Sequence, residues 1–378
     1  MSRTRAPADD FTGHWFTTIG VMDLEQEGAD VHGVYRWGGN ECAIAGRVKS
    51  GKLTFTYTEP KARGEGWFTL VRRGKFSGQW RTKGDNVWRP WVGERGFDGL
   101  WDTSFGMLRL IDEGPHLSGC YEGVGAATVE GRIDDGQFVL RYEEPNAAGD
   151  ARFTLSDDGR SFEGQWKQDG AAVWQPWNGR RLSQTPGQMW LVVIEAHWQR
   201  HLMDKEYSFG DMLKEFFARI PGVQFSHRFF SNEDGLRLWC RDLMYIPDPV
   251  VVLISSHATT AGIAVRGQTI NPQALAETLR MADNVQLLHF SACLTMQDES
   301  LLRELRRQVH FPISGYTTSV DWAASAILEF TYLDLILARG MAPADAADQL
   351  TRLLTFAGDK GFSGSVYPAA GFKFMSPG

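Results

Sequence analysis

The chain has 378 residues, of which 43% are hydrophobic and 22% are charged, a composition typical of globular proteins rather than of disordered or membrane-spanning ones. The net charge of -7 excludes the large positive excess on which nucleic-acid binding depends. No apolar run is long enough to span a bilayer, and residues 1–10 lack the apolar segment of a signal peptide. We therefore expect a cytoplasmic protein of two or three domains, with no membrane span and with free thiols at its four cysteines.

Two similar segments follow one another in the N-terminal half. Phe11-Thr-Gly-His-Trp15 recurs as Phe97-Asp-Gly-Leu-Trp101, a shift of 86 residues. Later motifs recur in the same order, and repetition at a fixed period indicates a duplicated structural unit. We predict repeat units at 11–96 and 97–182, a linker at 183–188 and a further domain at 189–378.

Each repeat has the pattern of short antiparallel strands. In Leu53–Tyr57 and Phe138–Tyr142 apolar and polar residues alternate, as they do in strands with one buried face. Each unit is therefore predicted to be all-β, forming one small barrel or meander. The Gly-x-Trp near the start of each unit resembles the opening strand of lipocalin-type barrels.

Ten of the fourteen tryptophans lie in the two repeats. Their matching positions favour a role in the barrel cores, and the alternative is a ligand pocket or a partner surface. Trp37 and Trp67 have no aromatic counterpart in the second repeat. They are the better candidates for a function that only one copy carries.

The pattern changes after residue 188. The continuous apolar runs Met189–Ile194 and Val250–Ile254 predict strands that are buried in a parallel sheet, and a third strand is predicted at Val285–Phe290. Segments with helical spacing lie between them, and a fourth, short strand is predicted at 312–316. Strands that alternate with helices predict an α/β domain with a mostly parallel sheet.

Two reactive residue types follow two of these strands. His257 comes after the second strand and Cys293 after the third, and loops at the carboxyl ends of strands are where reactive groups gather in such sheets. The order of strand, histidine, helix, strand and Ser-Ala-Cys resembles that of caspase-like cysteine peptidases, specifically their bacterial CHAT branch, over residues 189–378. The resemblance implies a Cys-His dyad that cleaves a protein or peptide substrate and needs no metal or cofactor.

The residue types fit this chemistry. A thiol with a pKa of about 8.5 is mostly protonated at neutral pH, so a base has to accept its proton, and His257 is suited to do so and then to protonate the leaving amine. Cys293 is predicted to stand just before a helix, whose N-terminus favours a thiolate. The backbone N–H of Cys293 and one in the loop Ala258–Gly262 are predicted to form an oxyanion hole.

Three further positions bear on activity and specificity. Ala258 stands where the family usually has glycine after the catalytic histidine. Ser291 stands where relatives that cleave after Arg or Lys often carry an acid, so its side chain does not indicate basic specificity. Asp321 is either the N-cap of a helix at 322–339 or an acid at the base of the pocket for the residue before the scissile bond.

The sequence thus favours a regulatory cysteine endopeptidase whose β-repeats sense or dock an activator or partner. The resemblance places such proteins in bacterial stress, defence or programmed-death systems. One alternative is an inactive caspase-fold binding or scaffold protein whose barrels hold a ligand or partner. Another is a structural module that uses the tryptophan-rich repeats for assembly.

Overall fold

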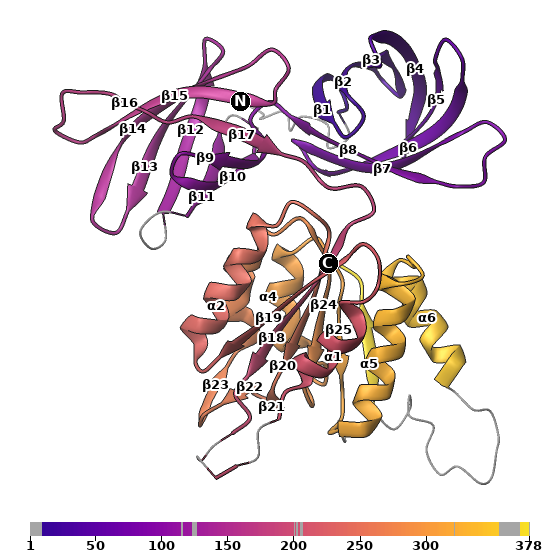
Figure 1. Ribbon diagram of the computed structural model, residues 1–378, viewed down its shortest axis with the longest axis vertical. Coiled ribbons are helices and arrows are strands. Elements are labelled where there is room, and N and C mark those ends of the chain that lie inside the picture. The colour runs from indigo at the N-terminus through magenta and orange to yellow at the C-terminus, as the bar shows by residue number, and fades with distance from the viewer. Residues whose placement is uncertain are drawn as a thin grey trace, which may run out of the picture. The chain divides into compact units, whose positions relative to one another are not determined.

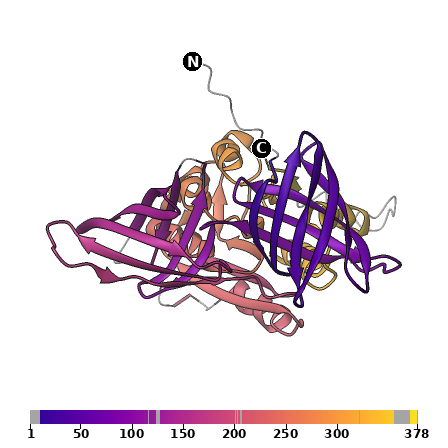
Figure 2. The ribbon, with the colours of Figure 1, turned by 90° about the horizontal axis from the view of Figure 1, so that it is seen from above.

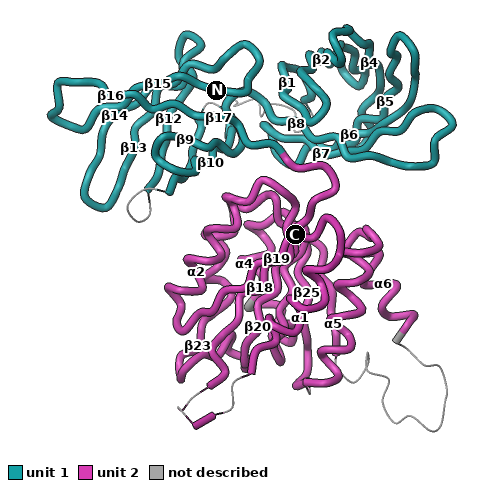
Figure 3. The backbone as a smooth tube through the Cα atoms, in the orientation of Figure 1, with its two compact units in different colours: residues 1–183 teal, residues 184–378 magenta. Residues whose placement is uncertain are grey.

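The computed structural model describes residues 10–114, 116–122, 127–199, 201, 203–204, 207–320, 322–354 and 371–377. The chain divides into two compact units, Met1–Ser183 and Gln184–Gly378 (Figure 3). The described residues of the first unit form strands and turns, whereas the second alternates strands and helices (Figure 1).

The first repeat is a closed barrel of eight antiparallel strands (Figure 2). Each strand pairs with the next along the chain, and the first pairs with the eighth, which closes the ring. The strands are β1 (Gly13–Thr17), β2 (Val21–Glu27), β3 (Asp30–Trp37), β4 (Asn40–Lys49), β5 (Lys52–Thr58), β6 (Arg63–Arg72), β7 (Lys75–Thr82) and β8 (Arg89–Arg95).

The second repeat closes in the same way, because its last strand lies between β15 and β9 and β14 also pairs with β15. A two-residue strand, β16 (Gln175–Pro176), precedes β17 and pairs with β15 on the same edge and in the same antiparallel register. The ring consists of β9 (Gly99–Thr103), β10 (Gly106–Asp112), β11 (Leu117–Tyr121), β12 (Ala127–Asp134), β13 (Gln137–Glu144), β14 (Ala147–Leu155), β15 (Ser161–Gln168) and β17 (Gly179–Leu182). The prediction of two tandem all-β units is confirmed.

Alternation along the strands fills the barrels. In β5, Leu53, Phe55 and Tyr57 are buried while the residues between them are exposed, since successive side chains of a strand point to opposite faces. Fully burying one such side chain stabilises the fold by about 1.5–3 kcal/mol. The largest buried side chains of the two cores are the tryptophans Trp15, Trp91, Trp101 and Trp177.

Matched contacts show that the two barrels are copies of one design. In each copy an indole N–H near the start of the unit donates to a carbonyl four residues earlier, and a second indole donates to a threonine hydroxyl. The pairs are Trp15 Nε1–Phe11 O (2.8 Å) and Trp101 Nε1–Phe97 O (2.9 Å), and Trp91 Nε1–Thr17 Oγ1 (2.9 Å) and Trp177 Nε1–Thr103 Oγ1 (3.1 Å). The first indole also lies under an arginine in both copies, Arg95 over Trp15 and Arg181 over Trp101, each at 4.3 Å.

The second unit is built on a six-stranded mixed sheet with the order β19-β18-β20-β24-β25-β26. Neighbours from β19 to β25 run parallel, and β26 runs antiparallel to β25. The strands are β18 (Met189–Ala196), β19 (Val223–Phe230), β20 (Val250–Ser255), β24 (Val285–Ser291), β25 (Ile313–Tyr316) and β26 (Phe372–Met375).

Helices cover both faces of this sheet (Figure 1). On one face, Leu213 of α1 and Leu333 of α5 share a core with Leu191 and Val193 of β18, and α2 and α4 lie on the other side of the sheet in Figure 1. The helices are α1 (Phe209–Phe217), α2 (Glu233–Asp242), α3 (Ala276–Leu279), α4 (Glu299–Gln308), α5 (Trp322–Leu337) and α6 (Pro343–Leu354), with short 3-10 turns η1 (Leu243–Tyr245) and η2 (Pro272–Leu275). In the part of the chain that the structure describes, no helix has the length and apolar character needed to cross a membrane.

A small separate sheet follows β20 where the sequence predicted a loop at 258–262. It consists of β21 (His257–Thr259), β22 (Gly262–Val265) and β23 (Gln268–Ile270), paired antiparallel in that order. Gly262 has φ 136°, and a Cβ there would lie 2.3 Å from the carbonyl oxygen of Ile270. The glycine is therefore required by the close approach of β22 to the end of β23.

Candidate functional site

The parallel register brings the two candidate catalytic residues to the same edge of the sheet. Ser255 ends β20 and is paired with Ser291, which ends β24. His257 and Cys293 each lie two residues beyond this pair. The carboxyl ends of adjacent parallel strands thus present both residues at equivalent positions, as the sequence order predicts.

Both residues line one cavity of about 240 Å³. One part of its wall is aromatic, with Trp198, Tyr207 and Trp322, and another part consists of small side chains that follow the strand ends. The cavity therefore combines an apolar wall with a thiol, an imidazole and a few hydroxyl groups, as small-molecule and peptide sites commonly do.

The Cys293 sulfur lies against the backbone of Val320. The Val320 N–H donates to Sγ at 3.5 Å, and Sγ lies 3.8 Å from the Val320 carbonyl oxygen. The chain leaves Cys293 through Leu294, which has φ 61°, and then a turn. Because α4 begins only at Glu299, the prediction of a helix N-terminus at Cys293 is wrong. Among the described residues, it is the backbone N–H of Val320, in the segment after β25, that donates to the sulfur.

The His257 side chain is exposed and meets the edge of the Trp198 ring, with 4.7 Å between ring centroids. The Trp198 indole N–H in turn donates to Glu195 Oε1 at 2.5 Å. The His257 imidazole thus packs against the Trp198 indole, and a hydrogen bond to the buried Glu195 carboxylate fixes the position of that indole.

Glu195 is a fully buried carboxylate at the end of β18. Besides Trp198, it accepts hydrogen bonds from the Ser208 hydroxyl (2.8 Å) and from the N–H groups of Phe209 (2.7 Å) and Gly210 (3.0 Å), and its Oε2 lies 2.8 Å from His227 Nε2. Burial by itself would raise the pKa of Glu195, but the hydrogen bonds, first among them that with His227, outweigh burial and lower the pKa. The group fixes the start of α1 beside the cavity.

A second buried carboxylate, Glu329 of α5, lies beside the end of β24. It accepts a hydrogen bond from the Ser291 hydroxyl at 3.0 Å and one from the Tyr316 hydroxyl at 2.7 Å, and its Oε1 is 3.3 Å from His289 Nε2. Burial and the Glu329 charge raise the pKa of Tyr316. Ser291 therefore lines the cavity with its hydroxyl bound to a carboxylate from a different element.

Two buried hydroxyls in the cavity wall, Ser255 Oγ and Ser256 Oγ, have no hydrogen-bond partner among the described residues. Unpartnered buried polar groups are rare in folded proteins because each costs about 1–3 kcal/mol. Their position beside His257 and Cys293 makes them groups that a bound ligand is able to satisfy.

The remaining predicted site residues lie apart from this cavity or cannot be placed. Neither Ala258 nor Gly262 is among the described residues that line it, since Gly262 lies across the β21–β22 turn and approaches β23. Asp321 lies outside the described residues. No group of three or more His, Cys, Asp or Glu side chains able to hold a metal occurs among the described residues.

The other cysteines differ from Cys293 in exposure. Cys42 and Cys240 are buried, and burial raises the pKa of both thiols, to about 12 for Cys240. Cys120 is half-buried, as Cys293 is. Cys120 is therefore the natural comparison for any test of thiol reactivity.

Sequence reasoning missed the two buried glutamates and Trp198. The signal for Glu195 was a single charged residue within the apolar run of β18, and that for Glu329 a charged residue in the middle of the apolar helix α5. A buried charge of this kind needs partners, but the sequence does not say which.

Comparisons with known proteins give no family for this chain. No protein-family model matches it, and no curated protein sequence matches it. Among solved structures, it is similar to the agglutinin of Burkholderia oklahomensis, with 11% identity over 45% of this chain and 88% of the agglutinin. The TM-score of 0.16 is too low to support an inference about fold or function.

Proposed function

We propose that the second unit is a caspase-like cysteine endopeptidase with Cys293 as nucleophile and His257 as general base and acid. The observation that carries this proposal is that both side chains line one cavity beyond the ends of adjacent parallel strands. A cysteine or a histidine on its own would not support a catalytic role, because each residue type is common in packed interiors.

The reaction proceeds in two steps. His257 accepts the proton of the Cys293 thiol, the sulfur attacks the carbonyl carbon of the scissile peptide, and the protonated imidazole delivers the proton to the departing amine. The resulting thioester is then attacked by water, which His257 deprotonates, and the carboxylic acid leaves as the thiol regains its proton. The Val320 N–H donates a hydrogen bond to Sγ and so helps to hold the sulfur in position for attack.

The cavity wall supports a peptide as the substrate. The unpartnered Ser255 and Ser256 hydroxyls are matched to the donors and acceptors of a peptide backbone, and the ring of Trp322 offers apolar contact to a side chain. We assign regulatory proteolysis to this unit and the docking of an activator or partner to the barrels.

Alkylation by iodoacetamide tests the reactive thiol. At pH 6.5, mass-spectrometric mapping of the native full chain should show Cys293 modified on the order of tenfold faster than Cys120, because the proposed mechanism has His257 accept the proton of the attacking thiol. His257→Ala should remove that difference while leaving the melting temperature within a few degrees. Equal rates at Cys293 and Cys120 in the unmutated protein would contradict the proposal.

Proteolysis itself is measured with a diverse peptide mixture, with Cys293→Ala as the inactive variant and Cys120→Ala as the matched control. Cleavage products that vanish only in Cys293→Ala support the peptidase. The second candidate function, an inactive binding protein, is favoured by the absence of Gly262 from the described cavity lining, which removes a predicted oxyanion donor. Strong alkylation of Cys293 without any cleavage would favour that alternative.

A further inference from the structure

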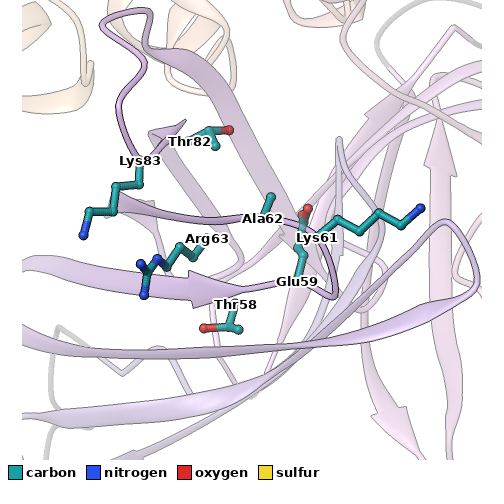
Figure 4. Close-up of a pocket in the computed structure, with 7 residues that line it drawn as sticks. All are labelled: Thr58, Glu59, Lys61, Ala62, Arg63, Thr82 and Lys83. Carbon is teal, nitrogen blue, oxygen red and sulfur yellow. The ribbon is translucent and has the colours of Figure 1, made fainter.

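The first barrel has an open pocket of about 530 Å³ where the β5–β6 turn meets the end of β7 (Figure 4). Three of the residues that line it are cationic, Lys61, Arg63 and Lys83, and one, Glu59, is anionic. Its volume falls in the range of small-molecule sites.

The backbone places two of the cations beside each other. The N–H of Lys83 donates to the carbonyl of Arg63 at 2.8 Å, so these residues are fixed neighbours across the start of β6 and the end of β7. Figure 4 shows both side chains extending on the same side of the pocket, whereas Lys61 points away from them. Among the described residues, no ion pair involves Arg63 or Lys83, and both side chains are exposed.

The one carboxylate in the pocket already has a partner. The Tyr35 hydroxyl donates to Glu59 Oε1 at 2.6 Å, and burial together with Glu59 raises the pKa of that tyrosine. The second barrel has the same contact, from the Tyr121 hydroxyl to Glu144 Oε1 at 2.6 Å. The tyrosine–glutamate hydrogen bond is thus common to both barrels. The Glu59 carboxylate is bonded to Tyr35 and forms no ion pair with Arg63 or Lys83 among the described residues.

The second barrel shows what this end looks like without the cations. Alignment on the shared Glu-Pro and Gly-Gln-Trp motifs puts Ala148 at the position of Arg63, and Asp169 at the position of Lys83. Asp169 is paired with Arg141 at 2.6 Å, and that contact lowers its pKa. The second barrel closes with neither cation at this end, so closure of a ring of this kind does not in itself require them.

We propose that the end of the first barrel binds a small anionic ligand whose phosphate or carboxylate oxygens pair with the Arg63 guanidinium and the Lys83 ammonium. The planar guanidinium offers parallel N–H donors to two oxygens, and the ammonium adds a second point charge. The nearby hydroxyl of Thr82, 3.4 Å from the Tyr57 hydroxyl, gives a polar group for the rest of the ligand. This site does not depend on the proposed peptidase.

Isothermal titration calorimetry of the full chain with pyrophosphate and with citrate tests the site. The two probes separate a phosphate ligand from a carboxylate ligand. We expect saturable one-to-one binding of at least one probe. The double variant Arg63→Ala, Lys83→Asp carries the residues of the second barrel and should weaken it at least about tenfold, since each charge-assisted contact contributes strongly.

Lys49→Asp is the matched control. Like Lys83→Asp, this variant replaces a lysine with the residue at the matching position of the second barrel, which is Asp134. Lys49 is the last residue of β4 and lies next to the β4–β5 turn, whereas the pocket lies at the opposite end of β5. Retention of binding in Lys49→Asp with loss in the double variant supports the site. Equal weakening in both variants indicates diffuse electrostatic attraction and overturns the proposal, as does the lack of saturable heat with either probe. Near-ultraviolet circular dichroism confirms that each variant keeps the barrel packing.

Discussion

His227 Nε2 lies 2.8 Å from Glu195 Oε2, which joins a partly buried histidine of β19 to a fully buried carboxylate near the end of β18. The same carboxylate holds the Trp198 ring on which His257 rests. The position of Trp198, and with it that of His257, therefore depends on Glu195, which is not among the described residues that line the cavity. This relation leads to the first two predictions.

Glu195→Ala should destabilise the second unit by about 3 kcal/mol or more, because it leaves the buried donors of Phe209, Gly210 and Trp198 without their acceptor. Urea unfolding followed by circular dichroism measures the loss. Glu215→Ala, which removes an exposed carboxylate of α1 that lies 3.4 Å from Arg219 just after the helix, should change stability by less than about 1 kcal/mol. Similar losses in both variants would contradict the assigned role of Glu195.

The stabilisation from Glu195 should depend on pH. Its pKa is lower in the folded chain than in the unfolded chain, so its contribution is present above the unfolded value of about 4.3 and is lost as pH falls through the lower, folded value. The difference in unfolding free energy between the unmutated protein and Glu195→Gln should therefore shrink as the pH falls below about 4. A difference that grows on acidification would show that the pKa is raised instead.

The tryptophans of the first barrel should differ sharply in their effect on stability. Trp91→Ala should cost about 3–5 kcal/mol, because it empties a fully buried site and removes the hydrogen bond to Thr17. Trp37→Ala should lower the free energy of unfolding by less than about 1 kcal/mol, because the Trp37 side chain is 54% exposed. Denaturant titration compares them, and a large loss for Trp37→Ala would assign it to the core rather than to a surface.

Thiol counting gives a fourth prediction. Under native conditions at pH 8, Ellman's reagent should titrate Cys293 and Cys120, whereas Cys42 and Cys240 should react only after denaturation, since burial raises the pKa of both. Four fast-reacting thiols in the native chain would contradict the placement of Cys42 and Cys240 in the cores.

Much of the fold was predictable because its signals are local. The duplication and the alternation of Leu53, Phe55 and Tyr57 predict two all-β units, and the apolar runs predict β18, β20 and β24. The edge strands β19 and β26 escaped prediction. β19 has only its two end residues fully buried, and β26 is four residues long. Neither pattern resembles a core strand before its neighbour is known.

The candidate site was predictable only in part. The order of His257 and Cys293 after two consecutive strands suffices to predict their shared edge, because parallel neighbours end on the same side. The backbone around them was not predictable in the same way. The β21–β22 turn carries Gly262 toward β23, and a turn separates Cys293 from α4. These features depend on contacts with distant segments, which no local pattern encodes.

The closure of both barrels has a consequence for how such a duplicated chain folds. Two adjacent units of similar sequence offer each strand a second, nearly equivalent partner, and exchange of strands between neighbouring repeats is a common route to misfolding and aggregation. In each ring the first and last strands are paired within their own copy, so the strands that the structure describes leave no open edge in either ring to which the neighbouring repeat could add a strand. Closure thus permits the two copies to stand next to each other in one chain and to diverge in sequence while each remains a separate folding unit.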